Sequence, residues 1–261
     1  MNKILPFANG LFFLGMVFIN YLSNTGAFNG ETMGSISAQY QNLFTPAGYA
    51  FSIWGLIYLL LAWFVIYFGP FRPNQHKAQT IADISGWFIL SCVVNSLWVV
   101  CWLYEATLLS VLLMIALLCI LWKIVSKTKN IPSTAPRAWF VSLQLPFQLY
   151  TSWITVALMA NMAAYLTKIG WDGLGLSEPI WAIVLLCLAG ALHMWLLWKE
   201  RMPAMTTVAI WAVVAIAIPH QGAHPVLFWL GLAWAIALGV QLLLYLATSF
   251  NAQKSIRRPL A

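Results

Sequence analysis

Eight apolar runs, each long enough to cross the hydrocarbon core of a bilayer, constrain the fold of this chain more than any other feature. A transmembrane helix needs about 20 mostly apolar residues, because the hydrocarbon layer is about 30 Å thick. Composition agrees, since 62% of the 261 residues are hydrophobic and only 7% are charged. We therefore expect an all-α integral membrane protein with eight transmembrane helices, at 5–24, 46–69, 84–104, 106–125, 138–166, 179–198, 204–219 and 226–248.

The distribution of basic residues supports this number of spans and predicts their orientation. If the chain starts in the cytoplasm, the segments on that side hold 12 of the 13 Lys and Arg residues, and only Lys168 lies outside. Cytoplasmic loops of membrane proteins carry such an excess. We therefore expect both termini in the cytoplasm, a multi-pass location in the cell (inner) membrane and lipid as the main surroundings. The net charge of +7 is scattered singly among apolar runs, so it does not indicate nucleic acid as a partner.

Motifs of conventional catalysis are missing from the sequence. It contains no phosphate-binding loop, no HExxH zinc motif and no Ser/His/Asp set in a plausible context. We therefore predict no catalytic residue, no metal site and no required cofactor, and we favour a non-enzymatic role without excluding catalysis. His193 falls inside the sixth span and is an alternative axial ligand for haem, whereas His220 and His224 are expected in a solvated outer loop.

Three of the predicted helices each carry a stripe that mixes aromatic rings with small or polar residues. Residues three, four, seven or eight apart lie on one face of an α-helix. Two interpretations fit: a cavity for a flat, largely apolar ligand, or ordinary helix packing with Asn as an interhelical hydrogen-bonding group. Spacing alone favours packing. The stripes are Trp54 with Tyr58, Asn95 with Trp98 and Trp102, and Trp153 with Ala157 and Asn161.

The segments around these stripes resemble the TspO/MBR family of tryptophan-rich sensory and translocator proteins. TPAGYAFSIWGLIY (45–58) is similar to the opening of the family's second helix. NSLWVVCW (95–102) and PFQLYTSWITVALMAN (146–161) are similar to its third and fifth helices. The chain departs from the family in having Phe-Ser-Ile-Trp where Phe-Gly-Pro-Val-Trp is typical, and in adding three helices. Because the three motifs occur in family order, they shift the interpretation of the stripes from packing to a ligand cavity.

The resemblance implies a TspO-like five-helix unit over 1–168, followed at 169–261 by three additional transmembrane helices and a short basic tail. It also implies an aromatic-lined cavity for a hydrophobic planar ligand, with porphyrin or haem as candidates, in a sensory or ligand-handling role. The loop of residues 25–45 would cap this cavity. A secondary transporter or carrier of a small lipophilic solute is the alternative. A homodimer is a candidate assembly, unless the added helices replace that contact. The implied ligand-binding residues are Trp54, Tyr58, Asn95, Trp98, Trp102, Trp153, Ala157 and Asn161.

Overall fold

The computed structural model describes residues 4–70, 75–129 and 137–256. Within these ranges, eight helical segments are long and apolar enough to cross a membrane, which confirms the predicted number of spans. Most observed ends lie within a few residues of the predicted ones. The third and eighth spans run further at the ends rich in polar residues, and the regular α-helix of the second and fifth spans begins seven residues later than predicted. The long helices are α1 (Ile4–Leu22), α3 (Ile53–Tyr67), α4 (Gln75–Leu103), α5 (Thr107–Thr128), α7 (Leu145–Lys168), α8 (Glu178–Trp198), α9 (Pro203–Ala217) and α10 (Pro225–Ile256).

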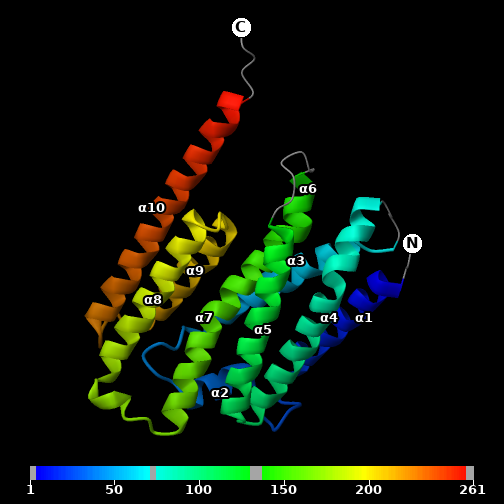
Figure 1. Ribbon diagram of the computed structural model, residues 1–261. Helices are drawn as coiled ribbons and strands as arrows, with labels where there is room; N and C mark the ends of the chain where they lie inside the picture. Colours follow the sequence, from blue (N-terminus) through cyan, green and yellow to red (C-terminus); the bar gives the residue numbers. More distant parts are fainter. Residues whose placement is uncertain (1–3, 71–74, 130–136, 257–261) are drawn as a thin grey trace.

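The helices form two adjoining groups that meet along α7 and α9 (Figure 1). In the first group α4 packs against α1 and α5, α7 packs against α5 and α3, and α3 also contacts α1. In the second group α8, α9 and α10 all contact one another. The contact of α9 with α7 therefore joins the three additional helices to the unit that holds the aromatic stripes.

Helix α9 is the most enclosed of the candidate spans, with 61% of its apolar window buried, against 17% for α10. Small side chains explain how neighbouring helices approach it closely. Ala209, Ala212 and Ala215 are fully buried along it, and small residues are enriched where membrane helices pack, because they let backbones come together. Many apolar residues of α10 instead remain exposed, as with Trp229 at 65% and Leu243 at 69%, and these suit contact with lipid chains.

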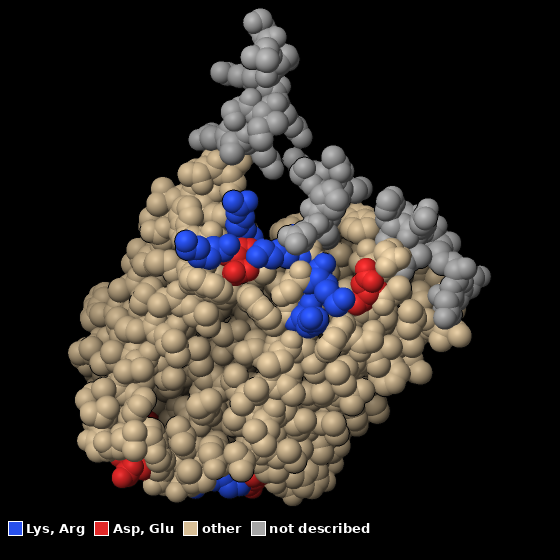
Figure 2. Space-filling view, in the orientation of Figure 1, with Lys and Arg blue, Asp and Glu red and all other residues tan. Residues whose placement is uncertain are grey.

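Charged side chains gather at the two ends of the bundle and are sparse between them (Figure 2). Several basic residues lie in, or directly after, the last two turns of α5 and α8, at one end of the bundle: Lys123, Lys127, Lys129, Lys199 and Arg201. Lys168 lies at the other end, where it contacts Glu105. The sequence predicts this separation, with most basic residues at one end and Lys168 at the other. Which end faces the cytoplasm stays a prediction.

Two local elements were not predicted. A short helix, α2 (Met33–Gln39), forms within the loop of residues 25–45, and Thr32 starts it with a capping box. The Ser35 amide donates to the Thr32 hydroxyl at 3.1 Å, while the Thr32 amide donates to the Ser35 hydroxyl at 2.8 Å. Before α7, the short helix α6 (Arg137–Trp139) continues into a π-helical segment, Phe140–Gln144. Pro146 follows directly, and a proline cannot donate the hydrogen bond of a regular α-helical turn, which favours a widened turn there.

Candidate functional site

Trp54 lies at the centre of an aromatic cluster that brings three helices together. It stacks on Tyr58 of the same helix and on Trp98 of α4, with ring centroids 5.5 Å and 6.2 Å apart. It also meets Tyr150 and Trp153 of α7 edge to face, at 5.6 Å and 6.5 Å. Offset stacks and edge-to-face contacts are the preferred geometries of aromatic pairs. The structure therefore places the predicted stripes of α3, α4 and α7 against one another.

A cavity of about 60 Å³ lies beside this cluster, at the end of the bundle covered by residues 25–45. Its walls come from α2, the segment before α3, the first turn of α3, and α4, α5, α7 and α9. Apolar surface dominates, and Asn161 of α7 is among its few polar side chains. Six of the eight residues predicted as ligand-binding line it, namely Trp54, Trp98, Trp102, Trp153, Ala157 and Asn161.

Tyr58 and Asn95, the other two predicted residues, are not among the residues that line the cavity. Tyr58 stacks on the Trp54 ring, with 5.5 Å between the ring centroids. The Asn95 side chain is fully buried and joins three helices, because its amide donates to the Tyr150 hydroxyl at 2.9 Å and its oxygen accepts from Asn20 at 2.7 Å. Both residues therefore contact side chains of the aromatic cluster, Tyr58 the ring of Trp54 and Asn95 the hydroxyl of Tyr150, without lining the cavity themselves.

Two indole nitrogens at the cavity have no hydrogen-bond acceptor in the described part of the chain. Nε1 of Trp98 and Nε1 of Trp153 are buried and unpaired, and both side chains line the cavity. By contrast, Nε1 of Trp102 donates to the Met33 carbonyl at 3.4 Å, and the Asn161 oxygen accepts from the Ser110 hydroxyl at 2.9 Å. A buried donor without an acceptor costs about 1–3 kcal/mol. The two indoles therefore mark where an acceptor-bearing ligand would stabilise the protein.

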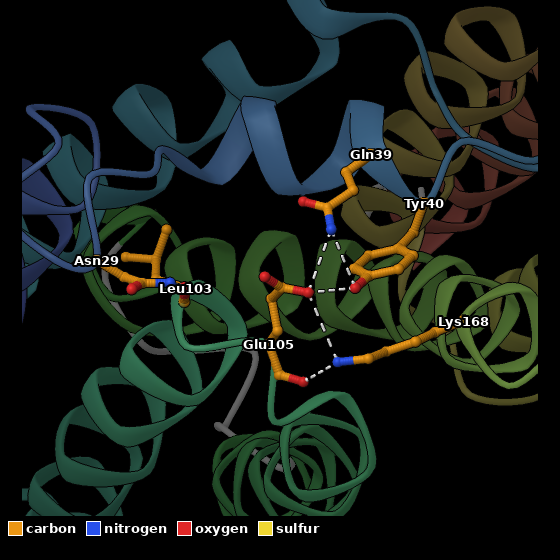
Figure 3. A network of polar contacts seen from close by, with 6 residues as sticks. All are labelled: Asn29, Gln39, Tyr40, Leu103, Glu105 and Lys168. Atoms are coloured by element: carbon orange, nitrogen blue, oxygen red, sulfur yellow. Dashed lines mark hydrogen bonds and ion pairs between the residues drawn. The ribbon is translucent and has the colours of Figure 1, made fainter.

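A network of polar contacts lies beside the cavity, at the end of the bundle covered by residues 25–45 (Figure 3). The Tyr40 hydroxyl donates to the Glu105 carboxylate in the turn between α4 and α5, and Gln39 donates to the same oxygen at 3.2 Å. Lys168, at the end of α7, donates to the Glu105 carbonyl at 2.6 Å and lies 3.7 Å from its carboxylate. Its ammonium also sits 5.5 Å from the centre of the Tyr40 ring. We call this network of Gln39, Tyr40, Glu105 and Lys168 the latch, and the covering segment of residues 29–40 the lid. Since Tyr40 lines the cavity, the latch fixes the end of the lid next to it.

The latch shifts the acidity of Tyr40 and Glu105. The hydrogen bond to Glu105 raises the pKa of Tyr40 to about 12, because the neighbouring carboxylate favours the protonated phenol. The same hydrogen bond lowers the pKa of Glu105, and the positive charge of Lys168 adds to that effect. At neutral pH the network therefore keeps a neutral phenol donating to an ionised carboxylate.

Helix α9 also contributes to the site, which sequence reasoning missed. Ala212 lines the cavity, and α9 anchors the segment that leads into α3. The Ala47 amide donates to the Ala215 carbonyl at 2.8 Å, and Nε1 of Trp211 donates to the Ala50 carbonyl at 3.3 Å. The proposed boundary at residue 168 remains a prediction, but these contacts show that the second group of helices shapes the first group's cavity.

A larger hollow of about 560 Å³ lies between α7, α8 and the loop of residues 41–44, and none of the eight predicted residues lines it. None of its buried side-chain N or O atoms lacks a partner in the described part of the chain. The Glu178 carboxylate accepts from the Leu43 amide at 2.7 Å, and Nε1 of Trp181 donates to the Gly173 carbonyl at 2.9 Å. Because buried unpaired donors occur at the smaller cavity instead, that cavity remains the candidate site.

His193, the histidine considered as an axial haem ligand, has a contact within the protein at both of its ring nitrogens. His193 is fully buried, and its two ring nitrogens contact the Ser152 hydroxyl at 2.9 Å and the Ala189 carbonyl at 2.8 Å. Neither nitrogen is left for an axial ligand. The expectation of a solvated loop is wrong for His220, which is 7% exposed and contacts the Leu43 carbonyl at 2.9 Å. The described residues contain no group of three His, Cys, Asp or Glu side chains placed to hold a metal ion.

The family assignment follows from a match over nearly the whole chain. The sequence pattern of the family described as TSPO-like protein matches residues 5–244, from the first helix into the last. The chain belongs to this TSPO-like family. The match confirms the resemblance seen in the three motifs and extends it over the additional helices, so these are part of the family pattern. No curated protein and no solved structure matches the chain.

Proposed function

We propose that this TSPO-like protein binds a hydrophobic planar ligand with hydrogen-bond acceptors, such as a porphyrin, in the cavity beside Trp54. The observation that carries the proposal is the pair of unpaired indole donors, Trp98 and Trp153, on a wall that is mostly aromatic and apolar. Flat ring systems stack on such side chains, and acceptor oxygens would satisfy the two N–H groups. Membership of the family supports a ligand-binding or sensory role for the chain.

Binding of a porphyrin requires the cavity to open. Its volume of about 60 Å³ is far below the roughly 300–1,000 Å³ typical of pockets for drug-sized ligands. Two elements could move. The Trp54 ring is only partly buried, and the lid of residues 29–40 is held by the polar latch around Glu105. The structure thus suits a closed state in which stacked side chains occupy the position of the ligand.

A titration of the purified protein with protoporphyrin, followed by the shift of the porphyrin absorbance band, tests the proposal. Trp98→Phe and Trp153→Phe each remove one donor and keep an aromatic ring, so each should weaken binding by about 3- to 10-fold, the effect of one hydrogen bond. Ala157→Leu fills the cavity and should weaken binding further. Trp195→Phe changes an exposed tryptophan on α8 and is the matched control.

Equal affinities of the wild type, Ala157→Leu and both indole variants would remove the assignment of the site. Uptake of the porphyrin into sealed vesicles separates a carrier from a binding protein. Net uptake that depends on the protein would favour the alternative of a transporter of lipophilic solutes, whereas saturable binding without uptake would support the sensory or ligand-handling role.

A further inference from the structure

A second crevice, of about 640 Å³, lies at the opposite end of the bundle, where Lys and Arg residues gather (Figure 2). The C-terminal ends of α5 and α8, the start of α9 and the first part of α7 surround it, and Tyr245 of α10 forms one side. No residue of the aromatic site lines it. Whatever this crevice binds is therefore separate from the ligand proposed above.

The charge of the crevice is positive and largely uncompensated. Lys129, Lys199 and Arg201 line it together with one carboxylate, that of Glu200, which leaves a net charge of three minus one, or +2. Lys129 forms the ion pair with Glu200 at 2.5 Å. All six acidic residues of the chain are described, and none of them pairs with Lys199 or Arg201. Two cations thus face the crevice without an anionic partner.

Gln148 of α7 supplies a neutral polar group at the same place. Its side chain lines the crevice and is only 6% exposed, and its Oε1 atom is buried without a hydrogen-bond partner in the described part of the chain. Gln144, one turn earlier, differs because its amide donates to the Thr128 carbonyl at 2.8 Å. The terminal amide of Gln148 can turn over and exchange its oxygen and nitrogen. A buried side-chain oxygen without a partner is uncommon, and turning the amide over puts its Nε2 donor group in that position.

The backbone of the α8–α9 turn adds to the positive potential. Arg201 has a φ of +57°, which is uncommon for a residue with a side chain and marks a constrained turn. Helix α9 begins directly afterwards at Pro203, without a side-chain cap, and Met202 and Pro203 line the crevice. The positive end of the helix dipole is therefore close to the crevice, an arrangement that favours anions.

We propose that this crevice binds a phosphate group, carried either by an anionic phospholipid or by a soluble phosphate compound. Arg201 presents a planar donor fork that matches phosphate oxygens, Lys199 adds a mobile ammonium, and the Gln148 amide donates from the inner wall. Tyr245 and the apolar residues at the rim would contact the carbon-containing part of the molecule. Non-specific attraction of the basic residues to an anionic membrane surface would not depend on the Gln148 amide, so this residue distinguishes the two cases.

Phosphorus NMR and calorimetry on the full-length protein, held in discs of neutral phosphatidylcholine, test the proposal. Short-chain phosphatidic acid and inorganic phosphate are titrated in separate experiments. The double variant Lys199→Gln/Arg201→Gln should weaken phosphate binding by about tenfold or more, because charge-assisted hydrogen bonds are lost. The matched control Lys123→Gln/Lys127→Gln removes the same charge from the same end of the bundle, outside the crevice, and should change the affinity by less than about twofold.

Gln148→Leu distinguishes specific binding in the crevice from a general electrostatic attraction of anions, because it changes no charge. It should weaken phosphate binding by about 3- to 10-fold, while the melting temperature of the unliganded protein stays equal or rises because an unpaired amide is removed. Saturable binding of phosphatidic acid alone assigns the site to a lipid headgroup, and equal binding of inorganic phosphate assigns it to a soluble compound. The proposal is overturned if neither probe saturates, if both charge variants weaken binding equally, or if Gln148→Leu leaves the affinity unchanged.

Discussion

Trp54 stacks on Trp98 across the interface of α3 and α4, with 6.2 Å between the ring centroids and 30° between the ring planes. This contact joins the two helices at the wall of the candidate site. Since Trp54 also touches Tyr58, Tyr150 and Trp153, one side chain organises most of the cluster. We therefore expect Trp54 to contribute more to the free energy of unfolding than any other side chain of the cluster.

Trp54→Leu should lower the free energy of unfolding by about 2–4 kcal/mol, because it removes a large ring and its aromatic contacts together. Thermal or denaturant unfolding of the detergent-solubilised protein measures this change. Trp195→Leu is the control, since Trp195 is 48% exposed on α8 and its replacement should change stability by no more than about 0.5 kcal/mol. A similar loss in both variants would show that the stack has no special role.

The latch between Tyr40 and Glu105 predicts a pH dependence on both sides of neutrality. The pKa of Glu105 lies below its ordinary value of 4.5 in the folded protein, so its contribution is present above that value and is lost as the pH falls through the lowered folded pKa. The pKa of Tyr40 is raised from 10.0 to about 12. Its contribution is present below pH 10 and is lost as the pH rises through about 12.

Glu105→Gln tests the acidic branch, because glutamine keeps an acceptor oxygen but does not titrate. The wild type should melt at a higher temperature than this variant near pH 7, and the difference should disappear as the pH falls through the lowered pKa of Glu105 and its carboxylate becomes protonated. Asp83→Asn is the control at the other end of the bundle, where Asp83 accepts from Gln79 at 3.1 Å. A melting difference that does not change with pH would contradict the proposed charge on Glu105.

The Asn20–Asn95–Tyr150 network predicts a structural effect that is separate from ligand binding. Asn95→Ala leaves the Asn20 amide and the Tyr150 hydroxyl without partners between α1, α4 and α7, so it should lower the free energy of unfolding by about 1–3 kcal/mol. Because Asn95 does not line the cavity, porphyrin affinity should change by less than about twofold.

A double-mutant cycle with Tyr150→Phe measures the coupling within this network. We expect the double variant to lose less stability than the sum of the two single variants, because they remove the same hydrogen bond. Additive losses, or a large loss of porphyrin affinity in Asn95→Ala, would return Asn95 to the role of a direct ligand contact that the sequence motif suggested.

The parts of the fold that local hydropathy controls could be predicted from the sequence. Each span is a continuous apolar run, so its position follows from composition over about 20 residues. The stripes at Trp54, Trp98 and Trp153 follow from the 3.6-residue period of a helix, and these residues do meet at one cavity. The family order of the motifs supplied what spacing alone could not, namely that the three stripes face one another.

The features that were missed depend on partners far apart in the sequence. Tyr40 and Glu105 lie 65 positions apart, and no periodic pattern links a loop residue to a distant turn. The contribution of α9 was missed for a similar reason. Nothing in the sequence around Ala212 marks it as part of a site, and its position at the cavity depends on how α7 and the segment before α3 pack against α9. Asn95 and Trp98 share a stripe, yet only Trp98 reaches the cavity, because neighbouring helices decide which part of a face remains open.

The attachment of the additional helices predicts sharply different effects for three glycines. A Cβ atom at Gly231 of α10 would lie 2.6 Å from the Ala217 Cβ and 3.1 Å from the Val213 carbonyl oxygen of α9. At Gly190 of α8 it would lie 2.3 Å from the Trp234 ring. Both positions are close helix contacts. At Gly239 of α10, by contrast, nothing lies within 4 Å.

Gly231→Ala should therefore lower the free energy of unfolding by about 1–3 kcal/mol, since the clash involves the backbone of α9, which cannot turn aside. Gly190→Ala should cost less wherever the Trp234 ring can rotate away. Gly239→Ala should raise stability by about 0.5–1 kcal/mol through helix propensity alone. Thermal unfolding of the three variants checks this order. Because α9 also lines the cavity through Ala212, Gly231→Ala should weaken porphyrin binding as well, whereas an unchanged affinity would show that the cavity does not depend on how α10 supports α9.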